Sequence, residues 1–188
     1  MPRAARTLPQ SGYLHVICRG NNHKKIFYSQ SDFRIFYKIA YALKLEEGIK
    51  ILHYCFMPNH VHFLIGLTKK SQLARFMKRL CLKYFYSYQR KYAYSGHLWH
   101  SRFKSKIIED DAYFIQCGKY IELNPVRASL VKQPQDYLFS SYRYYAQGTQ
   151  DKLIDTDPFY LTLADTPEER QQHYQKTIIN EIVQGVLY

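Results

Sequence analysis

Two apolar segments separated by Pro58-Asn59 impose the strongest local constraint on how this chain can fold. Residues 49–56 and 60–67 are rich in β-branched, aromatic and other apolar side chains, and a Pro-Asn pair between such segments is typical of a turn. We therefore expect two strands joined by a tight turn. Since successive side chains of a strand point to opposite faces, His60 and His62 should emerge on one face, with the apolar residues between and after them directed toward a core.

The two histidines form a candidate half of a metal site. Neutral imidazole is a common ligand of divalent metal ions, and two imidazoles on one face of a strand are spaced to share one ion. The alternative is that His60 and His62 are ordinary polar surface at the start of a strand. A metal site would need a third ligand from another part of the chain.

The rest of the pattern predicts an α+β fold. Hydrophobic periodicity and turn residues predict further strands at 13–19 and 102–108, and helices from Ser31 or Asp32 to residue 47, at 71–91 and at 111–123. Strand, helix, strand, strand, helix, strand is the order of a ferredoxin-like antiparallel sheet with helices on one face. The helix from Asp111, which we expect to end before Asn124-Pro125, is additional and would cover the open face of the sheet.

The additional helix carries a candidate nucleophile. Tyr120 and Asn124 lie one turn apart on the same side, together with Tyr113 and Cys117, whereas Glu122 points elsewhere. Asn124 could supply the third metal ligand through its carbonyl oxygen, and Tyr120 could attack a phosphorus atom polarised by that metal. The alternative for Tyr120 is a half-buried packing role, since the chain contains 19 tyrosines.

The net charge of +12 is distributed unevenly. From Gln147 onward the chain has three Lys or Arg against seven Asp or Glu, so the positive charge resides in the preceding part. A basic body interleaved with Tyr and Phe is typical of a nucleic-acid-binding protein, although basic proteins with other partners exist. We divide the chain into a catalytic domain, residues 1–146, and an acidic helical extension, residues 147–188, with a helix starting at Thr166-Pro167. The sequence leaves open whether the extension packs on the body, covers its basic face or joins subunits.

Composition also predicts a cytoplasmic protein with no membrane partner. No apolar run approaches the roughly 20 residues of a membrane span. The basic residues 1–6 are not followed by the apolar region of a signal peptide, and we expect residues 1–12 to form a flexible basic arm. The cysteines are widely spaced among apolar residues, which favours buried free thiols over a zinc site or disulfides. They are Cys18, Cys55, Cys81 and Cys117.

Five sequence blocks together resemble the REP-associated tyrosine transposases, which are relatives of the IS200/IS605 transposases. The blocks are Met57–His62, Gly96–Trp99, Arg102–Ser105, Tyr120–Ala128 and Ser140–Tyr142. They occur in the order typical of that family and extend over residues 13–145, and the combination is far more specific than any single block. The resemblance implies a single-stranded DNA endonuclease and strand transferase of the HUH type that cuts beside hairpin-forming palindromes.

The same resemblance implies roles for individual residues. His60, His62 and Asn124 would bind Mg²⁺ or Mn²⁺, and Tyr120 would form a 5′-phosphotyrosine bond and leave a free 3′-OH. One alternative is a non-catalytic protein of the same fold that binds DNA hairpins. Another, a His-x-His metallohydrolase, is disfavoured because no further His or Asp cluster follows at suitable spacing. Relatives include dimers and proteins that work alone, so both a monomer and a homodimer fit.

Polar and basic residues near these blocks are candidate DNA contacts. They are Arg19, Asn21, Asn22, Lys24, Lys25, Arg102, Lys104 and Arg127. For the loop after the first strand, the alternative is an ordinary solvated turn. For Arg102, Lys104 and Arg127, the alternative is a structural salt bridge.

Overall fold

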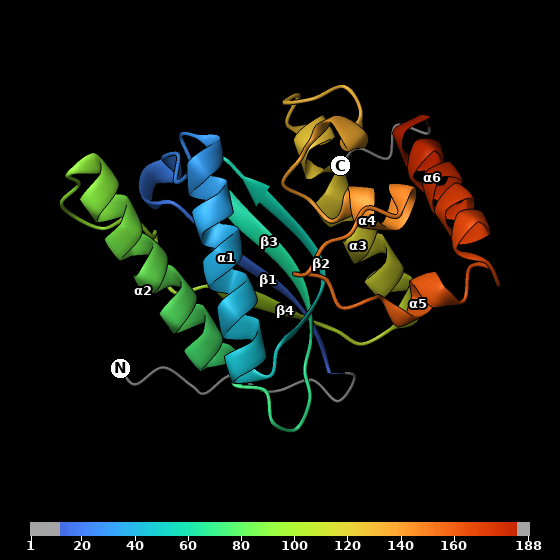
Figure 1. Cartoon of the computed structure of the whole chain (residues 1–188), viewed down its shortest axis with the longest axis horizontal. Coiled ribbons are helices and arrows are strands. Elements are labelled where there is room, and N and C mark those ends of the chain that lie inside the picture. The colour runs from blue at the N-terminus through green and yellow to red at the C-terminus, as the bar shows by residue number, and fades with distance from the viewer. Residues whose placement is uncertain (1–11, 184–188) are drawn as a thin grey trace.

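The computed structural model describes residues 12–183 and is built on a four-stranded antiparallel sheet (Figure 1). Its strands are β1 (Tyr13–Arg19), β2 (Lys50–Met57), β3 (His60–Gly66) and β4 (Lys104–Ile108), in the spatial order β2-β3-β1-β4. Helix α1 (Gln30–Glu47) connects β1 to β2, and α2 (Leu73–Tyr92) connects β3 to β4. This topology is ferredoxin-like, so the predicted fold class is confirmed. The expected N-terminal arm lies outside the described residues except for Gly12.

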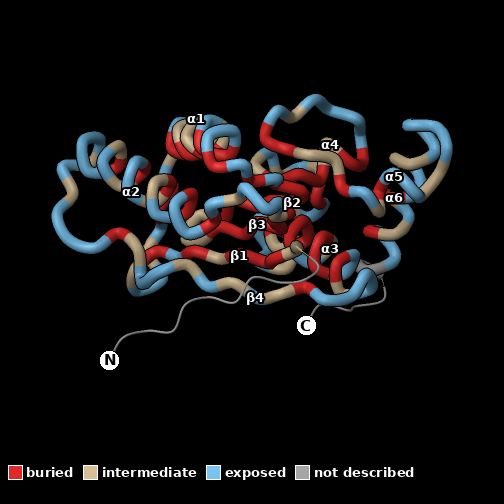
Figure 2. Tube along the Cα trace, turned by 90° about the horizontal axis from the view of Figure 1, so that it is seen from below, coloured by how far each residue is buried: buried red, intermediate tan, exposed pale blue. Residues whose placement is uncertain are grey.

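Helices α1 and α2 cover one face of the sheet. Figure 2 shows both helices on the same side of the strands. Phe36 of α1, Phe76 of α2, and Phe56 and Phe63 of the β2-β3 hairpin are fully buried between them. Because side chains alternate along β3, the burial of Phe63 in this core directs the histidine pair to the other face.

Helix α1 begins with a capping box, and the predicted N-cap at Ser31 or Asp32 is wrong. Ser29 occupies the N-cap position, and Asp32 Oδ2 accepts a hydrogen bond from the Ser29 backbone N–H at 2.9 Å. Asp32 also accepts from Lys91 Nζ at 2.5 Å and from the Tyr92 hydroxyl at 2.7 Å. Asp32 therefore supports the start of α1 from inside the helix and ties it to the end of α2.

The predicted start of the fourth strand at Arg102 is also wrong. Ile17 pairs with Lys104, whereas Gly20 pairs with Trp99 in an isolated bridge. Between these two pairs the chain advances three residues from Ile17 to Gly20 but five residues from Trp99 to Lys104. The residues between Trp99 and Lys104, Arg102 included, must loop out of the sheet.

The additional helix, α3 (Asp111–Arg127), packs on the other face but does not end before Asn124-Pro125 as predicted. Proline lacks the N–H that would bond to the Ile121 carbonyl. The Asn124 side chain compensates, because its Nδ2 lies 3.5 Å from the Ile121 oxygen and 2.8 Å from the Tyr120 oxygen. The helix therefore continues past the proline.

The buried side of α3 includes Cys117, which the sequence placed beside Tyr120. Cys117 is buried with Phe114 and Ile121 against the sheet. Position 117 is three residues from both Phe114 and Tyr120, so helical spacing allowed either side and apolar burial decided between them. As predicted, the cysteines are free thiols; Cys18, Cys55 and Cys117 are buried and Cys81 is half-buried.

The chain after α3 packs on the body, which is one of the options that the sequence left open. It contains η2 (Pro134–Asp136), α4 (Tyr142–Gln147), α5 (Pro158–Leu161) and α6 (Pro167–Val183), grouped at one end of the molecule in Figure 1. Asp155 Oδ2 accepts hydrogen bonds from Lys44 Nζ at 2.8 Å and from the Ile51 N–H at 2.9 Å. As predicted, Thr166 and Glu169 form hydrogen bonds at the start of α6. Between residues 12 and 183, no helix has the length and apolar character needed to cross a membrane.

Candidate active site

The register of the sheet gathers candidate residues from β1 and β3. Arg19 pairs with His60, and Ile17 pairs with His62, so these side chains lie side by side on the face opposite α1 and α2. They border a cavity of about 260 Å³. Its lining residues are Ile17, Arg19, His23, Asn59, His60, His62 and Tyr120. Four residues predicted from the sequence, including the tyrosine of α3, therefore share one cavity.

Hydrogen bonds occupy one nitrogen of each histidine. Nδ1 of His60 lies 2.6 Å from Asn59 Oδ1, and Nδ1 of His62 lies 2.9 Å from Nε2 of His15. An amide oxygen only accepts, so the proton of neutral His60 sits on Nδ1. Nε2 is then the atom through which His60 could bind a ligand, and the same holds for His62 if His15 accepts its proton.

The surroundings of His60 and His62 favour the neutral form of both imidazoles at neutral pH. Burial lowers the pKa of His60 to about 4, assisted by the positive charge of Arg19 and by His23. Burial also lowers the pKa of His62 well below its usual value, assisted by the neighbouring histidines. A neutral imidazole offers a lone pair, so the chemistry of this donor set fits a divalent metal ion.

His15 is a site residue that the sequence pattern did not single out. It is buried on β1, and its ring is stacked on that of His62 with a centroid separation of 5.1 Å. Burial, assisted by the charge of Lys106, lowers the pKa of His15 to about 4. A neutral His15 can accept the Nδ1 proton of His62, which is the role of a residue that orients a metal ligand. Strand alternation placed His15 on the correct face, but its contact with His62 depends on the register.

Tyr120 stands beside these rings. Its ring centroid lies 5.9 Å from that of His15 and 5.8 Å from that of His62, and the side chain is 38% exposed. The guanidinium carbon of Arg127 lies 4.8 Å from the Tyr120 ring centroid, and Nη1 of Arg127 donates to the Tyr120 carbonyl at 3.2 Å. The surroundings therefore suit a nucleophile better than a packing residue.

Asn124 lies one turn after Tyr120 but is not among the residues that line the cavity. Its Nδ2 donates to helix carbonyls, which leaves Oδ1 as the atom that could bind a cation. Within residues 12–183, no three His, Cys, Asp or Glu side chains are placed to hold a metal ion. A third protein ligand would therefore come from another type of group, such as the amide oxygen of Asn124.

Of the candidate DNA contacts, Arg19 alone lines this cavity. The loop after β1 contains the short helix η1 (Asn21–His23), followed by Lys24, whose Nζ donates to the Tyr94 hydroxyl at 2.8 Å and lies over that ring. The charge of Lys24 is thus already engaged with Tyr94. The exposed candidates are Arg19, Asn22, Lys25, Arg102 and Lys104.

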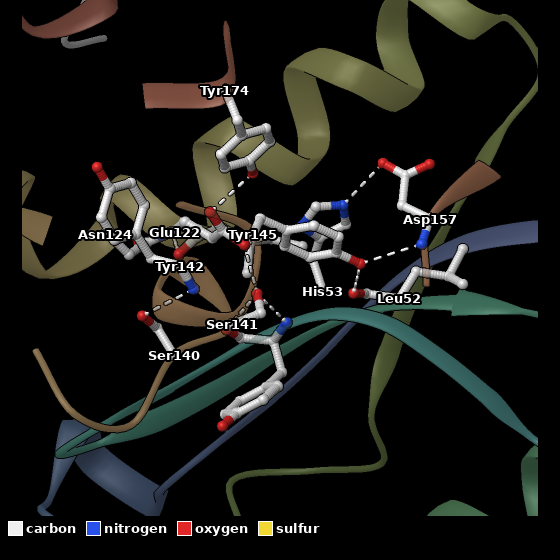
Figure 3. A network of polar contacts seen from close by, with 12 residues as sticks. Leu52, His53, Glu122, Asn124, Ser140, Ser141, Tyr142, Tyr145, Asp157 and Tyr174 are labelled. Atoms are coloured by element: carbon white, nitrogen blue, oxygen red, sulfur yellow. Dashed lines mark hydrogen bonds and ion pairs between the residues drawn. The ribbon is translucent and has the colours of Figure 1, made fainter. Parts of the chain in front are cut away.

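A buried polar network holds α3 in place (Figure 3). His53 of β2 lies between two carboxylates, with Nδ1 2.9 Å from Glu122 Oε1 and Nε2 3.1 Å from Asp157 Oδ2. Carboxylates only accept hydrogen bonds, so both ring nitrogens donate. Burial lowers the pKa of His53, but the hydrogen bonds to Asp157 and Glu122 outweigh it and raise the pKa to about 9. The ring is therefore an imidazolium ion at neutral pH.

The same network joins α3 to the C-terminal extension. Glu122 also accepts hydrogen bonds from Ser141 Oγ at 2.5 Å and from the Tyr174 hydroxyl of α6 at 2.8 Å (Figure 3). The His53 ring packs closely on Gly118, where a Cβ atom would lie 3.0 Å from Nε2. Because Glu122 is two residues from the candidate nucleophile, the extension fixes the segment of α3 that carries it. No sequence signal marked this network, whose histidine and glutamate are 69 residues apart.

The fold and the cavity define a class of α+β proteins in which a His-x-His strand faces a tyrosine-bearing helix. The profile of the family described as "Transposase IS200 like" matches residues 10–124, which include the strand and the tyrosine. The chain belongs to this family of transposases.

Two solved structures are similar to this chain. A REP-associated tyrosine transposase bound to a REP hairpin has the same fold, with a TM-score of 0.65 and 18% identity over 84% of this chain and 93% of that chain. A putative transposase from Deinococcus radiodurans R1 has a TM-score of 0.45 and 17% identity over 64% of this chain and 96% of that chain. A comparison with curated proteins gave no match. The match to the family profile confirms the family resemblance seen in the sequence.

Proposed function

We propose that this chain is a metal-dependent single-stranded DNA endonuclease and strand transferase that cuts beside hairpin-forming palindromes. The observation that carries the proposal is the position of Tyr120, 5.8 Å from His62 between ring centroids, in a cavity that His60 and Arg19 also line. The transposase family and the hairpin bound by the relative of similar fold support this substrate class.

Tyr120 is the nucleophile in this proposal. Its phenolic oxygen forms a bond to phosphorus while the P–O3′ bond breaks, the phenolic proton passes to solvent, and the departing 3′ oxygen takes up a proton to become a 3′-OH. The protein is left with a 5′-phosphotyrosine bond. One phosphoester bond has replaced another, so a second 3′-OH can attack the adduct and rejoin DNA without ATP.

His60, His62 and Asn124 would hold Mg²⁺ or Mn²⁺, and the bound ion would withdraw charge from the scissile phosphate. His15 orients the His62 ring and keeps the lone pair of Nε2 available. Arg19, beside His60, would neutralise a phosphate of the DNA backbone.

The remaining features concern DNA binding and assembly. Lys25, Arg102 and Lys104 are exposed and would contact backbone phosphates. Both a monomer and a homodimer fit this proposal.

A second candidate function is a protein of the same fold that binds DNA hairpins without cutting. One observation favours it, namely that Asn124 does not line the cavity, so that only two of the three proposed ligands do. The two functions differ in whether a covalent adduct forms.

The test is to incubate the purified protein with Mn²⁺ and labelled single-stranded DNA that carries the palindrome neighbouring its gene. The expected result is a protein–DNA adduct that survives denaturation. Tyr120→Phe should abolish the adduct and retain DNA binding. Tyr113→Phe is the matched control, since Tyr113 lies on the same helix outside the cavity. Binding without any adduct would support the second function, and an adduct that depends on Tyr113 instead of Tyr120 would overturn the assignment.

A further inference from the structure

A second cavity is formed by α2 and the segment before β4. It has a volume of about 540 Å³. Helix α2 contributes Ala74, Met77, Lys78, Cys81, Leu82 and Phe85, and the other wall contains residues 96–99 and 101–103. Cavities of this size that are lined mainly by apolar and aromatic side chains are typical of sites for small organic groups. We call this cavity the α2 pocket.

The aromatic side chains of the α2 pocket are held in place yet accessible. Trp99 donates a hydrogen bond from Nε1 to the Cys81 carbonyl at 3.0 Å, and its ring packs toward Tyr84 of the core with a centroid separation of 6.0 Å. Trp99 and Phe85 are half-buried, and Leu82 is 44% exposed. The pocket therefore offers a preformed aromatic surface to a flat ligand.

The rim of the α2 pocket is positively charged. Lys78 and Arg102 are exposed, and neither forms an ion pair with another residue in the range 12–183. By contrast, Arg75 and Arg79 of the same helix both pair with Glu47. The two free cations complement a ligand that carries negative charge next to its flat group, as a nucleotide does.

Backbone hydrogen bonds of residues 98 and 100 link the wall of the α2 pocket to the loop and strand beside the candidate active site. The Asn21 N–H donates to the Leu98 carbonyl at 2.8 Å, and the His100 N–H donates to the Arg19 carbonyl at 3.0 Å. Leu98 lines the α2 pocket, whereas Arg19 lines the cavity of the histidine pair. A DNA strand that leaves the cavity over Arg19 would thus meet the rim of the α2 pocket next.

We propose that the α2 pocket binds one base of the single-stranded DNA that flanks the scissile phosphate. The base stacks on Trp99 and Phe85, and Lys78 and Arg102 neutralise the adjoining phosphates. The inference rests on the proposed function, which supplies the DNA. Every base has an aromatic face, so the pocket sets the path of the strand and the position of the cut more than it reads the identity of the base.

The test uses the full-length protein, without added metal, and a hairpin oligonucleotide whose single-stranded flanks carry an abasic site at each position in turn. Trp99 is the only tryptophan, so its fluorescence reports directly on the pocket. Unmodified DNA should change this fluorescence. One abasic position should abolish the change and weaken binding about tenfold, the effect expected for one stacked base.

Variants of the pocket identify the interaction. Phe85→Ala should weaken binding of unmodified DNA about tenfold, with no additional loss at the sensitive abasic position. Lys78→Gln, at an exposed position, provides a test that does not depend on core packing and should reduce the salt dependence of binding. Tyr86→Ala is the matched control, because Tyr86 is 53% exposed on the same helix and does not line the pocket.

The outcomes separate this inference from the proposed function. The inference alone would be overturned if the protein binds the DNA and forms the adduct normally, but Phe85→Ala and the abasic site weaken binding independently at every position. An oligomer that dissociates in Phe85→Ala, with DNA binding unchanged, would assign the pocket to a protein contact and also overturn it. Loss of all binding to hairpin DNA by the wild-type protein would overturn both.

Discussion

Raising the pH from about 6 to about 10 should destabilise this protein through His53, a buried residue that does not line the cavity of the histidine pair. Its pKa is about 9 in the folded protein, against 6.5 for an ordinary histidine. The folded state therefore binds this proton more tightly than the unfolded chain. The sign follows from linkage: the stabilisation is fully present below about pH 6.5 and is lost as the pH rises through 9. A tenfold change in proton affinity is worth about 1.4 kcal/mol, so the loss amounts to about 3 kcal/mol.

The assay is the free energy of unfolding from urea titrations across this pH range. The wild type is compared with His53→Gln, which keeps a hydrogen-bonding side chain but cannot carry the charge. Buried thiols and phenols also titrate at high pH. Subtracting the free energy of unfolding of His53→Gln from that of the wild type at each pH removes the contribution that they make to both proteins. The two stability curves should converge as the pH rises. His173→Gln, at an exposed position of α6, should instead run parallel to the wild type. Parallel curves for His53→Gln and the wild type would refute the imidazolium assignment.

Further predictions concern packing, metal and DNA. Gly118→Ala should lower the free energy of unfolding by about 1–3 kcal/mol in urea titrations, because the new Cβ would lie 3.0 Å from the His53 ring. His15→Phe should weaken Mn²⁺ binding about 10- to 100-fold by calorimetry, whereas Tyr120→Phe should leave it nearly unchanged; equal affinities in wild type and His15→Phe would rule out an orienting role. Affinity for hairpin DNA should fall steeply with salt, and Arg19→Gln should reduce the slope of log K against log salt by about one. An unchanged slope would remove Arg19 from the phosphate contacts.

The local pattern of the sequence was enough to predict much of the fold. Alternation along a strand is a property of the backbone, so the placement of His60 and His62 on one face followed from their spacing alone. Helix periodicity likewise placed Tyr120 on the helix that covers this face. Errors arose where a partner distant in sequence changed a local rule. The Asn124 side chain bonds to the carbonyl that Pro125 leaves without its usual donor, so α3 continues past Pro125. The pairing of Gly20 with Trp99 makes the next residues loop out, so β4 begins at Lys104 and not at Arg102.

The sequence by itself determined the order of strands and helices, the shared face of the histidine pair and the family, because these depend on spacing and local propensity. Only the tertiary structure decided which distant residues meet. The register of β1 on β3 brings His15 onto His62, and the docking of α3 and of the extension places Glu122 and Asp157, respectively, beside His53. Such contacts arise from the simultaneous packing of several elements, and no single segment encodes them.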